Sequence, residues 1–202
     1  MNLDNENLEW KLCEAYFSIL EISMSPDVSI DILCIEAKLS REEVDKIVPN
    51  NFMDFKIFFL KILISKLDRD VLTELKVDIA DDTVSSTYDK ILEGLSLRFE
   101  KYFQYKQSLN ILSNSSKQKI EVFFNVFSEN YNFSSNLLTL IEENQNCVMK
   151  TLKSLALNIV FTKSLEIFFN DENKDMDKVI RYLDKYLSDM EDIGLFIGVI
   201  KK

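Results

Sequence analysis

Apolar residues recur at steps of three and four along most of the chain, and this spacing is typical of amphipathic helices. In the first stripe, Leu8, Leu12, Tyr16 and Ile19 lie on one face of a helix over residues 4–23. The same criterion predicts helices at about 30–37, 40–48, 51–75, 83–105, 106–113, 115–131, 134–170 with a weak point at 142–146, and 175–190. The charged segment 76–82 is expected to be a linker.

Turn-forming residues are too scarce for a protein made of hairpins. The 202 residues include 3 Gly and 2 Pro, and 47% of them are hydrophobic. Sheets joined by tight turns need more Gly and Pro than this, whereas long helices do not. The sequence therefore predicts an all-α protein with a sizeable core.

Two short helices joined by a tight turn stand out near the amino terminus. Ser29 is placed to cap the first, and Ser40 with Glu43 has the spacing of a capping box for the second. Pro49 ends the second helix, and a long apolar helix follows. This layout predicts a three-helix headpiece with a helix-turn-helix over residues 1–50, and a helical body over residues 51–202.

The turn of this headpiece reads Leu33-Cys34-Ile35-Glu36-Ala37-Lys38-Leu39-Ser40. It resembles the I-A-x-x-A-G-V-S pattern of the TetR family of one-component regulators. The family continues x-x-x-Y-x-x-F-x-x-K, where this chain has Asp45, Val48 and Asn51 at the three fixed positions. Lys38 replaces the turn glycine, and Asp45 replaces the aromatic residue that contacts phosphate. The resemblance implies a headpiece that binds DNA and a body that binds a small ligand and pairs with a second copy.

A second resemblance is to the COQ-nine-type lipid-binding family of ubiquinone biosynthesis, which shares the TetR fold without reading DNA. Val48-Pro49-Asn50-Asn51-Phe52-Met53-Asp54-Phe55 resembles its F-P-G-G-x-x-D-L run. Phe168-Phe169-Asn170-Asp171-Glu172-Asn173, followed by Arg181-Tyr182-Leu183-Asp184-Lys185, is similar to its W-L-x-D-x-S and F-L-D-R stretches. The family's G-D-x-x-x-D-x-N-W-Y-T-K-R signature is absent. This resemblance implies a lipid or isoprenoid ligand.

Charge opposes DNA binding by the headpiece. The chain has a net charge of −10, and residues 1–50 hold eleven acids and four bases, so most of the acidity lies there. Neutralisation of phosphates by Lys and Arg supplies most of the non-specific affinity for DNA. The candidate DNA-binding residues are Ser29, Lys38, Ser40, Arg41 and Lys46. Operator DNA is therefore a partner that the fold favours and the charge disfavours.

The body offers an aromatic cluster and an apolar helix as candidate sites. Its candidate pocket for a small apolar ligand or lipid consists of Phe99, Phe103, Phe123, Phe127 and Phe161, although such stripes are more often core. Helix 147–170 is apolar on more than one side, which is typical of a central helix or a homodimer face. The candidate dimer face consists of Leu155, Ile159, Leu165, Ile180, Leu183 and Leu187.

Other classes of function are disfavoured by what the chain lacks. It has no His, which excludes three-His zinc sites and Ser-His-Asp triads. Its three cysteines have unrelated spacings and suit a reducing compartment. We expect no catalytic site, metal or cofactor, no transmembrane segment, and a cytoplasmic location. Three functions stay open: a TetR-like regulator with an apolar effector, a lipid-binding accessory protein without DNA binding, and an acidic protein-interaction module.

Overall fold

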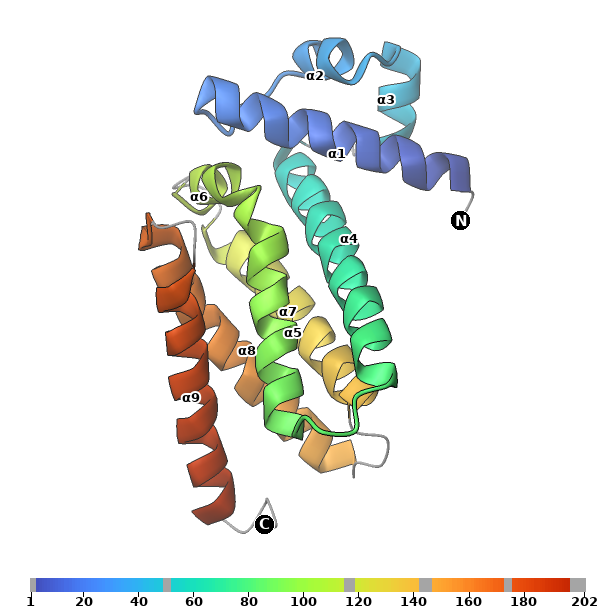
Figure 1. The fold of residues 1–202 in the computed structure, drawn as a ribbon. Helices are drawn as coiled ribbons and strands as arrows, with labels where there is room; N and C mark the ends of the chain where they lie inside the picture. Colours follow the sequence, from blue (N-terminus) through green and yellow to red (C-terminus); the bar gives the residue numbers. More distant parts are fainter. Residues whose placement is uncertain (1–2, 49–51, 115–118, 142–146, 173–175, 197–202) are drawn as a thin grey trace. The chain divides into compact units, whose positions relative to one another are not determined.

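The structure is a computed structural model that describes residues 3–48, 52–114, 119–141, 147–172 and 176–196. These residues form helices and no strands, which confirms the all-α prediction (Figure 1). The helices are α1 (Leu3–Ser23), α2 (Ile30–Ala37), α3 (Arg41–Ile47), α4 (Phe52–Ala80), α5 (Thr87–Phe103), α6 (Lys106–Asn114), α7 (Lys119–Ile141), α8 (Cys147–Asn170) and α9 (Asp177–Phe196). None of these described helices has the length and apolarity needed to cross a membrane.

The chain folds into two compact units that do not coincide with the split expected at residue 50. Unit 1 consists of residues 1–66 and 104–126, and unit 2 of residues 67–103 and 127–202. The first unit thus combines α1, α2 and α3 with the start of α4 and with α6. Helix α6 belongs here because it packs against α1, where the Ser108 hydroxyl donates to the Phe17 carbonyl at 3.0 Å.

The ends of α2 and α3 are fixed by the residues that the sequence indicates. The Ser29 hydroxyl accepts a hydrogen bond from the Ile32 amide at 3.3 Å and caps α2. Ser40 and Glu43 form the reciprocal capping box of α3. Between the helices, Lys38 adopts the left-handed conformation with φ 53° and ψ 47°. That conformation is unfavourable for residues with a Cβ.

Aromatic packing between α1 and α4 forms the centre of unit 1. Tyr16 stacks on Phe59 with ring centroids 5.0 Å apart, and both side chains are fully buried. The Cys13 thiol donates to the Phe59 carbonyl at 3.4 Å. Phe17 meets the edge of Tyr105 at 5.7 Å. The apolar stripe of the first predicted helix therefore does face the core.

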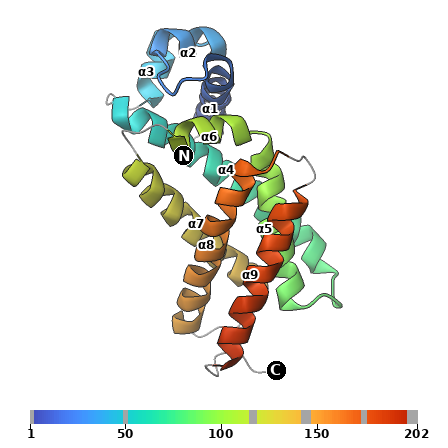
Figure 2. The same ribbon diagram turned by 90° about the vertical axis from the view of Figure 1, so that its left-hand side faces the viewer.

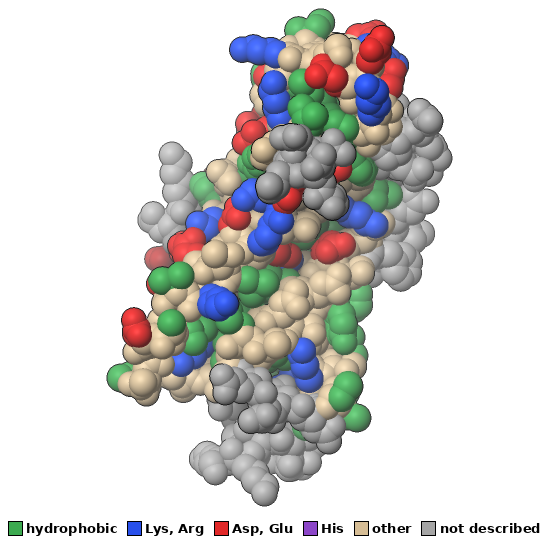
Figure 3. All heavy atoms as spheres, turned by 90° about the vertical axis from the view of Figure 1, so that its right-hand side faces the viewer, with side chains coloured by type: hydrophobic (Ala, Val, Ile, Leu, Met, Phe, Trp, Pro, Cys, Tyr) green, Lys and Arg blue, Asp and Glu red, His purple; other side chains and the backbone are tan. Residues whose placement is uncertain are grey.

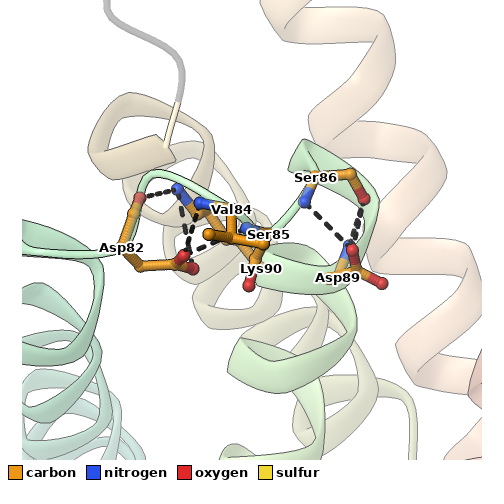
Figure 4. A network of polar contacts seen from close by, with 6 residues as sticks. All are labelled: Asp82, Val84, Ser85, Ser86, Asp89 and Lys90. Atoms are coloured by element: carbon orange, nitrogen blue, oxygen red, sulfur yellow. Dashed lines mark hydrogen bonds and ion pairs between the residues drawn. The ribbon is translucent and has the colours of Figure 1, made fainter.

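The prediction of a linker at 76–82 is wrong, because α4 continues to Ala80. The chain turns only at Asp82, whose carboxylate accepts hydrogen bonds from the amides of Val84 and Ser85 at 2.9 and 3.0 Å (Figure 4). Ser86 and Asp89 then bind each other reciprocally, and this pair starts α5 at Thr87. The helix predicted to begin at about residue 83 thus begins four residues later, at Thr87.

Unit 2 is a helical bundle in which α8 and α9 lie side by side and run in opposite directions (Figures 1 and 2). Helix α9 also packs on α5, where the Tyr88 hydroxyl donates to the Asp184 carbonyl at 2.7 Å. Gly94 allows the close approach of α5 to α7, since an added Cβ would lie 2.7 Å from Leu137 Cδ1. The largest buried rings in the core of this unit are Phe99, Phe133, Phe161 and Phe168.

Candidate functional site

The helix-turn-helix presents α3 to solvent along nearly all of its length. Among its seven residues only Val44 is buried, and it is fully so. Arg41 and Lys46 are exposed on α3, and Lys38 is exposed in the turn. Ser29 and Ser40 serve as helix caps, as described above. The structure therefore brings the candidate DNA-binding residues together on one unit and leaves the three bases accessible.

On this surface Arg41 forms ion pairs with two aspartates. Arg41 Nη1 lies 2.8 Å from Asp31 Oδ1, and Arg41 Nε lies 2.9 Å from Asp45 Oδ1. Hydrogen bonding to Asp45, together with the charges of both acids, raises the pKa of Arg41. The pairs are exposed, so water screens them and a stronger anion can replace either acid. In the free protein, Arg41 nevertheless presents little net positive charge to a phosphate.

The aromatic cluster predicted in the body surrounds a buried ion pair. Phe99 and Phe161 stack with centroids 4.5 Å apart and are almost fully buried. Arg98, which is fully buried, places its guanidinium carbon 4.2 Å from the Phe161 centroid and 4.3 Å from that of Phe133. Asp68 supplies the charge that this arginine requires. The cluster is therefore polar at its centre.

The bond between Arg98 and Asp68 is bidentate. Arg98 Nε and Nη2 donate to the two carboxylate oxygens of Asp68 at 2.6 and 2.7 Å, and the Tyr102 hydroxyl donates to Asp68 Oδ1 at 3.0 Å. Burial alone would lower the pKa of Arg98, but the charge of Asp68 raises it above its ordinary value. Burial raises the pKa of the Asp68 carboxyl, against the opposing influence of Arg98. The pair is thus tightly coupled and shielded from water.

Several buried polar atoms of unit 2 have no hydrogen-bond partner among the described residues. They are Arg98 Nη1, both side-chain polar atoms of Asn130, and Ser154 Oγ. Each such atom costs roughly 1–3 kcal/mol when nothing satisfies it. Sequence reasoning missed this group, because charged and amide side chains are usually exposed on helices. The remaining pocket candidates are less informative: Phe103 and Phe127 are half-buried, and the side chain of Phe123 lies outside the description.

The candidate dimer face divides into an outer and an inner part. Leu155 and Ile159 are 37% and 51% exposed, and Leu165 and Ile180 are half-buried. Leu183 and Leu187, in contrast, are 0% and 6% exposed. Both side chains are thus covered within the chain itself, by a helix that packs on α8 and α5, and only the outer part of the candidate face is open to a second copy.

Two further exposed residues extend the outer part of that face along α8. Val148 and Leu152 are 63% and 51% exposed, and with Leu155 and Ile159 they follow steps of four, three and four. At about 100° per residue, these four side chains lie opposite the buried face of α8 that contains Leu157 and Phe161. We call this set the α8 stripe. It is an apolar seam with the spacing of a coiled-coil face.

A hollow between α8 and α9 was not predicted from the sequence. Its volume is about 510 Å³, and it is lined by Lys163, Glu166, Ile167, Asn170, Asp171, Lys178, Tyr182 and Tyr186. Tyr182 meets Tyr186 edge to face at 4.9 Å, and Lys163 Nζ lies 5.2 Å from the Tyr186 centroid. Lys178 donates to the buried Asp171 carboxylate at 3.2 Å. Lys178 and Asp171 therefore neutralise each other's charge within the hollow.

The described residues contain no group of three or more acidic or cysteine side chains placed to hold a metal ion. Comparison with protein families, with curated proteins and with solved structures finds no match to this chain. The class that the fold and the site define is thus an all-α protein with a capped helix-turn-helix in its first unit and a buried ion pair in its second.

Proposed function

We propose that this chain is a TetR-like transcriptional regulator that works as a homodimer. The observation that carries the proposal is the pair α2 and α3, which is capped at both amino ends and buries a single residue of its second helix. A helix held in this way and otherwise open to solvent is the element that helix-turn-helix proteins place in the major groove. Its acidity predicts weak binding that depends on few phosphate contacts.

DNA binding then depends on a change of partner by Arg41. In the free protein its guanidinium binds Asp31 and Asp45, and on DNA it would bind a guanine edge or a phosphate instead. Lys38 and Lys46 supply the other positive charges near α3. Because so few bases are available, the affinity should fall with salt by a small slope rather than the steep one of strongly basic regulators.

The test is fluorescence anisotropy of the full chain with a duplex from its own upstream DNA and with a scrambled duplex, from about 50 to about 200 mM salt. Arg41→Ala should weaken binding to the upstream duplex by about tenfold or more. The matched control is Arg181→Ala in unit 2, because Arg181 is also exposed and also pairs with an acid, Asp177, on its own helix. Absence of binding to both duplexes at the lowest salt would refute DNA recognition.

The homodimer part of the proposal rests on the α8 stripe. If two copies of α8 pair in opposite directions, Val148 lies opposite the partner's Ile159 and Leu152 lies opposite the partner's Leu155. Residues 147–165 hold three lysines and no acid, and helical spacing directs Lys150 and Lys153 away from the stripe. The contact would therefore be apolar, symmetric and free of opposed charges, as a two-fold interface requires.

Sedimentation velocity tests the homodimer directly. Leu152→Glu should convert the dimer to monomer, because it places two carboxylates in an apolar seam. Val77→Glu is the control, since Val77 is 70% exposed and lies on α4. A wild-type protein that is monomeric at micromolar concentration, or a Leu152→Glu variant that stays dimeric, would contradict this part of the proposal.

The effector part rests on Arg98 Nη1, a buried donor without a hydrogen-bond partner among the described residues, whose guanidinium lies against Phe133 and Phe161. An apolar molecule with one carbonyl or carboxyl oxygen could accept from Arg98 Nη1 while its apolar part replaces the contact between Phe99 and Phe161. Native mass spectrometry of the purified protein should then detect a co-purifying small molecule. Asn130→Leu should reduce its occupancy, because it removes two more buried polar atoms of unit 2 that have no partner among the described residues, and Val84→Leu, at a 92% exposed position, should not.

A further inference from the structure

The outward face of α2 combines isoleucines with acids. Ile32 and Ile35 are 52% and 76% exposed, whereas Leu33 and Ala37 on the opposite side are buried. Asp31 and Glu36 are exposed beside the two isoleucines. The outward positions of this short helix thus hold two large apolar and two negative side chains. We call these four residues the α2 face.

The end of α1 extends this surface. The Ser18 hydroxyl donates to the Glu36 carboxylate at 3.3 Å, which joins the two helices at that point. One helical turn further along α1 lies Ile22, which is 79% exposed, and Met24 beyond it is 63% exposed. Exposed apolar side chains in such a group mark contact sites more often than isolated ones do. Figure 3 shows hydrophobic side chains among acidic and basic ones on this unit, at the top of that view.

The electrostatic environment of the α2 face is negative. Arg41 is the nearest arginine, and its guanidinium is already held between Asp31 and Asp45. Glu42 adds a further exposed acid on α3. Nucleic acids and anionic lipid surfaces would be repelled by these acids. A second headpiece of this chain would be repelled as well, because residues 1–50 carry an excess of seven negative charges.

We propose that the α2 face, with the adjoining end of α1, binds a basic amphipathic segment of another protein. Lysines or arginines of that segment would pair with Asp31 and Glu36, and its apolar residues would cover Ile32 and Ile35. Charge complementarity sets the sign of the partner, and an amphipathic protein segment can present basic and apolar side chains together, as protein interfaces do. This inference does not rest on the proposed function, because it uses the side chains of α2 rather than those of α3, and the two surfaces meet only at the pair of Arg41 with Asp31 among the contacts described above.

The experiment uses the full chain and a synthetic peptide of about 20 residues in which leucine and lysine follow helical spacing. A second peptide has the same lysines with serine in place of leucine. Binding is followed by heteronuclear NMR, and the affected amides are mapped on the chain. The α2-face variant is Ile32→Ser with Ile35→Ser, and its control is Val77→Ser with Val84→Ser, at positions 70% and 92% exposed on the other unit.

The proposal expects the leucine–lysine peptide to shift amides of α2 and the end of α1. The α2-face variant should bind it about tenfold or more weakly, while the control variant binds as the wild type does. Equal binding of the serine–lysine peptide would show attraction by charge alone and would overturn the proposal. So would shifts confined to the α8 stripe, unaltered affinity of the α2-face variant, or no binding at low salt.

Discussion

Replacing Asp68 with asparagine should lower the free energy of unfolding by about 3–5 kcal/mol, the usual cost of breaking a buried ion pair on one side. Asparagine keeps the shape of the side chain but loses its charge. Its amide group would also face Arg98 Nε or Nη2, so one of the bonds at 2.6 and 2.7 Å would join two donors. The Tyr102 hydroxyl, which donates to the Asp68 carboxylate at 3.0 Å, would at most donate to a neutral amide oxygen, which is a weaker acceptor.

The rings around Arg98 cannot replace the lost carboxylate. Phe133 and Phe161 lie 4.3 and 4.2 Å from its guanidinium carbon, and a desolvated cation–π contact contributes about 2 kcal/mol. These contacts are present before and after the substitution, so they do not offset the change. The uncompensated charge of Arg98 therefore dominates the result.

Urea unfolding followed by far-UV circular dichroism measures this loss. With a slope of about 2 kcal/mol/M, the midpoint should fall by about 2 M urea. The control is Glu74→Gln, which breaks the partly exposed pair of Glu74 with Lys101 at 2.6 Å and should cost less than about 1 kcal/mol.

A double variant decides whether the charge or the shape is responsible. Asp68→Leu with Arg98→Met removes both charges and keeps most of the volume, so it should be more stable than Asp68→Asn. The reasoning is refuted if Asp68→Asn costs less than about 1 kcal/mol, or if the double variant is the less stable of the two.

Three further predictions follow from single features of the two units. A thiol reagent should modify exposed Cys147 in the native protein but reach Cys13 only after unfolding, because burial raises the pKa of the Cys13 thiol and shields it from solvent. Modification of Cys13 in the native protein, detected by mass-spectrometric mapping, would contradict this. Hydrogen bonds from Ser85 and Val84 lower the pKa of Asp82 to about 2, so the stability that this turn contributes should be intact above about pH 4 and be lost as the pH falls towards 2. A carboxyl NMR titration of Asp82 with a midpoint near the ordinary aspartate value would argue against this. Lys38→Gly should stabilise unit 1 by about 1 kcal/mol, because glycine adopts the left-handed conformation without strain, and urea unfolding should show a higher midpoint.

The helix-turn-helix could be predicted from the sequence because local signals determine it. Ser29, Ser40 and Glu43 act on backbone groups within three residues of themselves, and the helices begin where these residues indicate. The linker predicted at 76–82 failed for a related reason. The segment is charged but contains no Gly or Pro, and charge alone does not end a helix.

The buried polar centre of unit 2 could not be predicted in the same way. Arg98 and Asp68 are 30 residues apart, and nothing local to either indicates that they meet. The available signal was the position of Arg98 within an apolar stripe, three residues after Leu95 and one before Phe99. The division of the dimer face also required the structure, because Ile159 and Leu187 are equally apolar and differ only in what packs against them.

The discontinuity of unit 1 has a consequence for synthesis of the chain. During synthesis α1 leaves the ribosome before α6, although its Phe17 carbonyl accepts a hydrogen bond from Ser108, which is 91 residues further along the chain. Unit 1 is complete only when the chain has been made to residue 126. Until then the α1 surface that receives α6 is uncovered, and a fragment ending at residue 50 would keep that surface exposed permanently. Unit 1 can therefore complete its fold only after residues 67–103, the first segment of unit 2, have been translated.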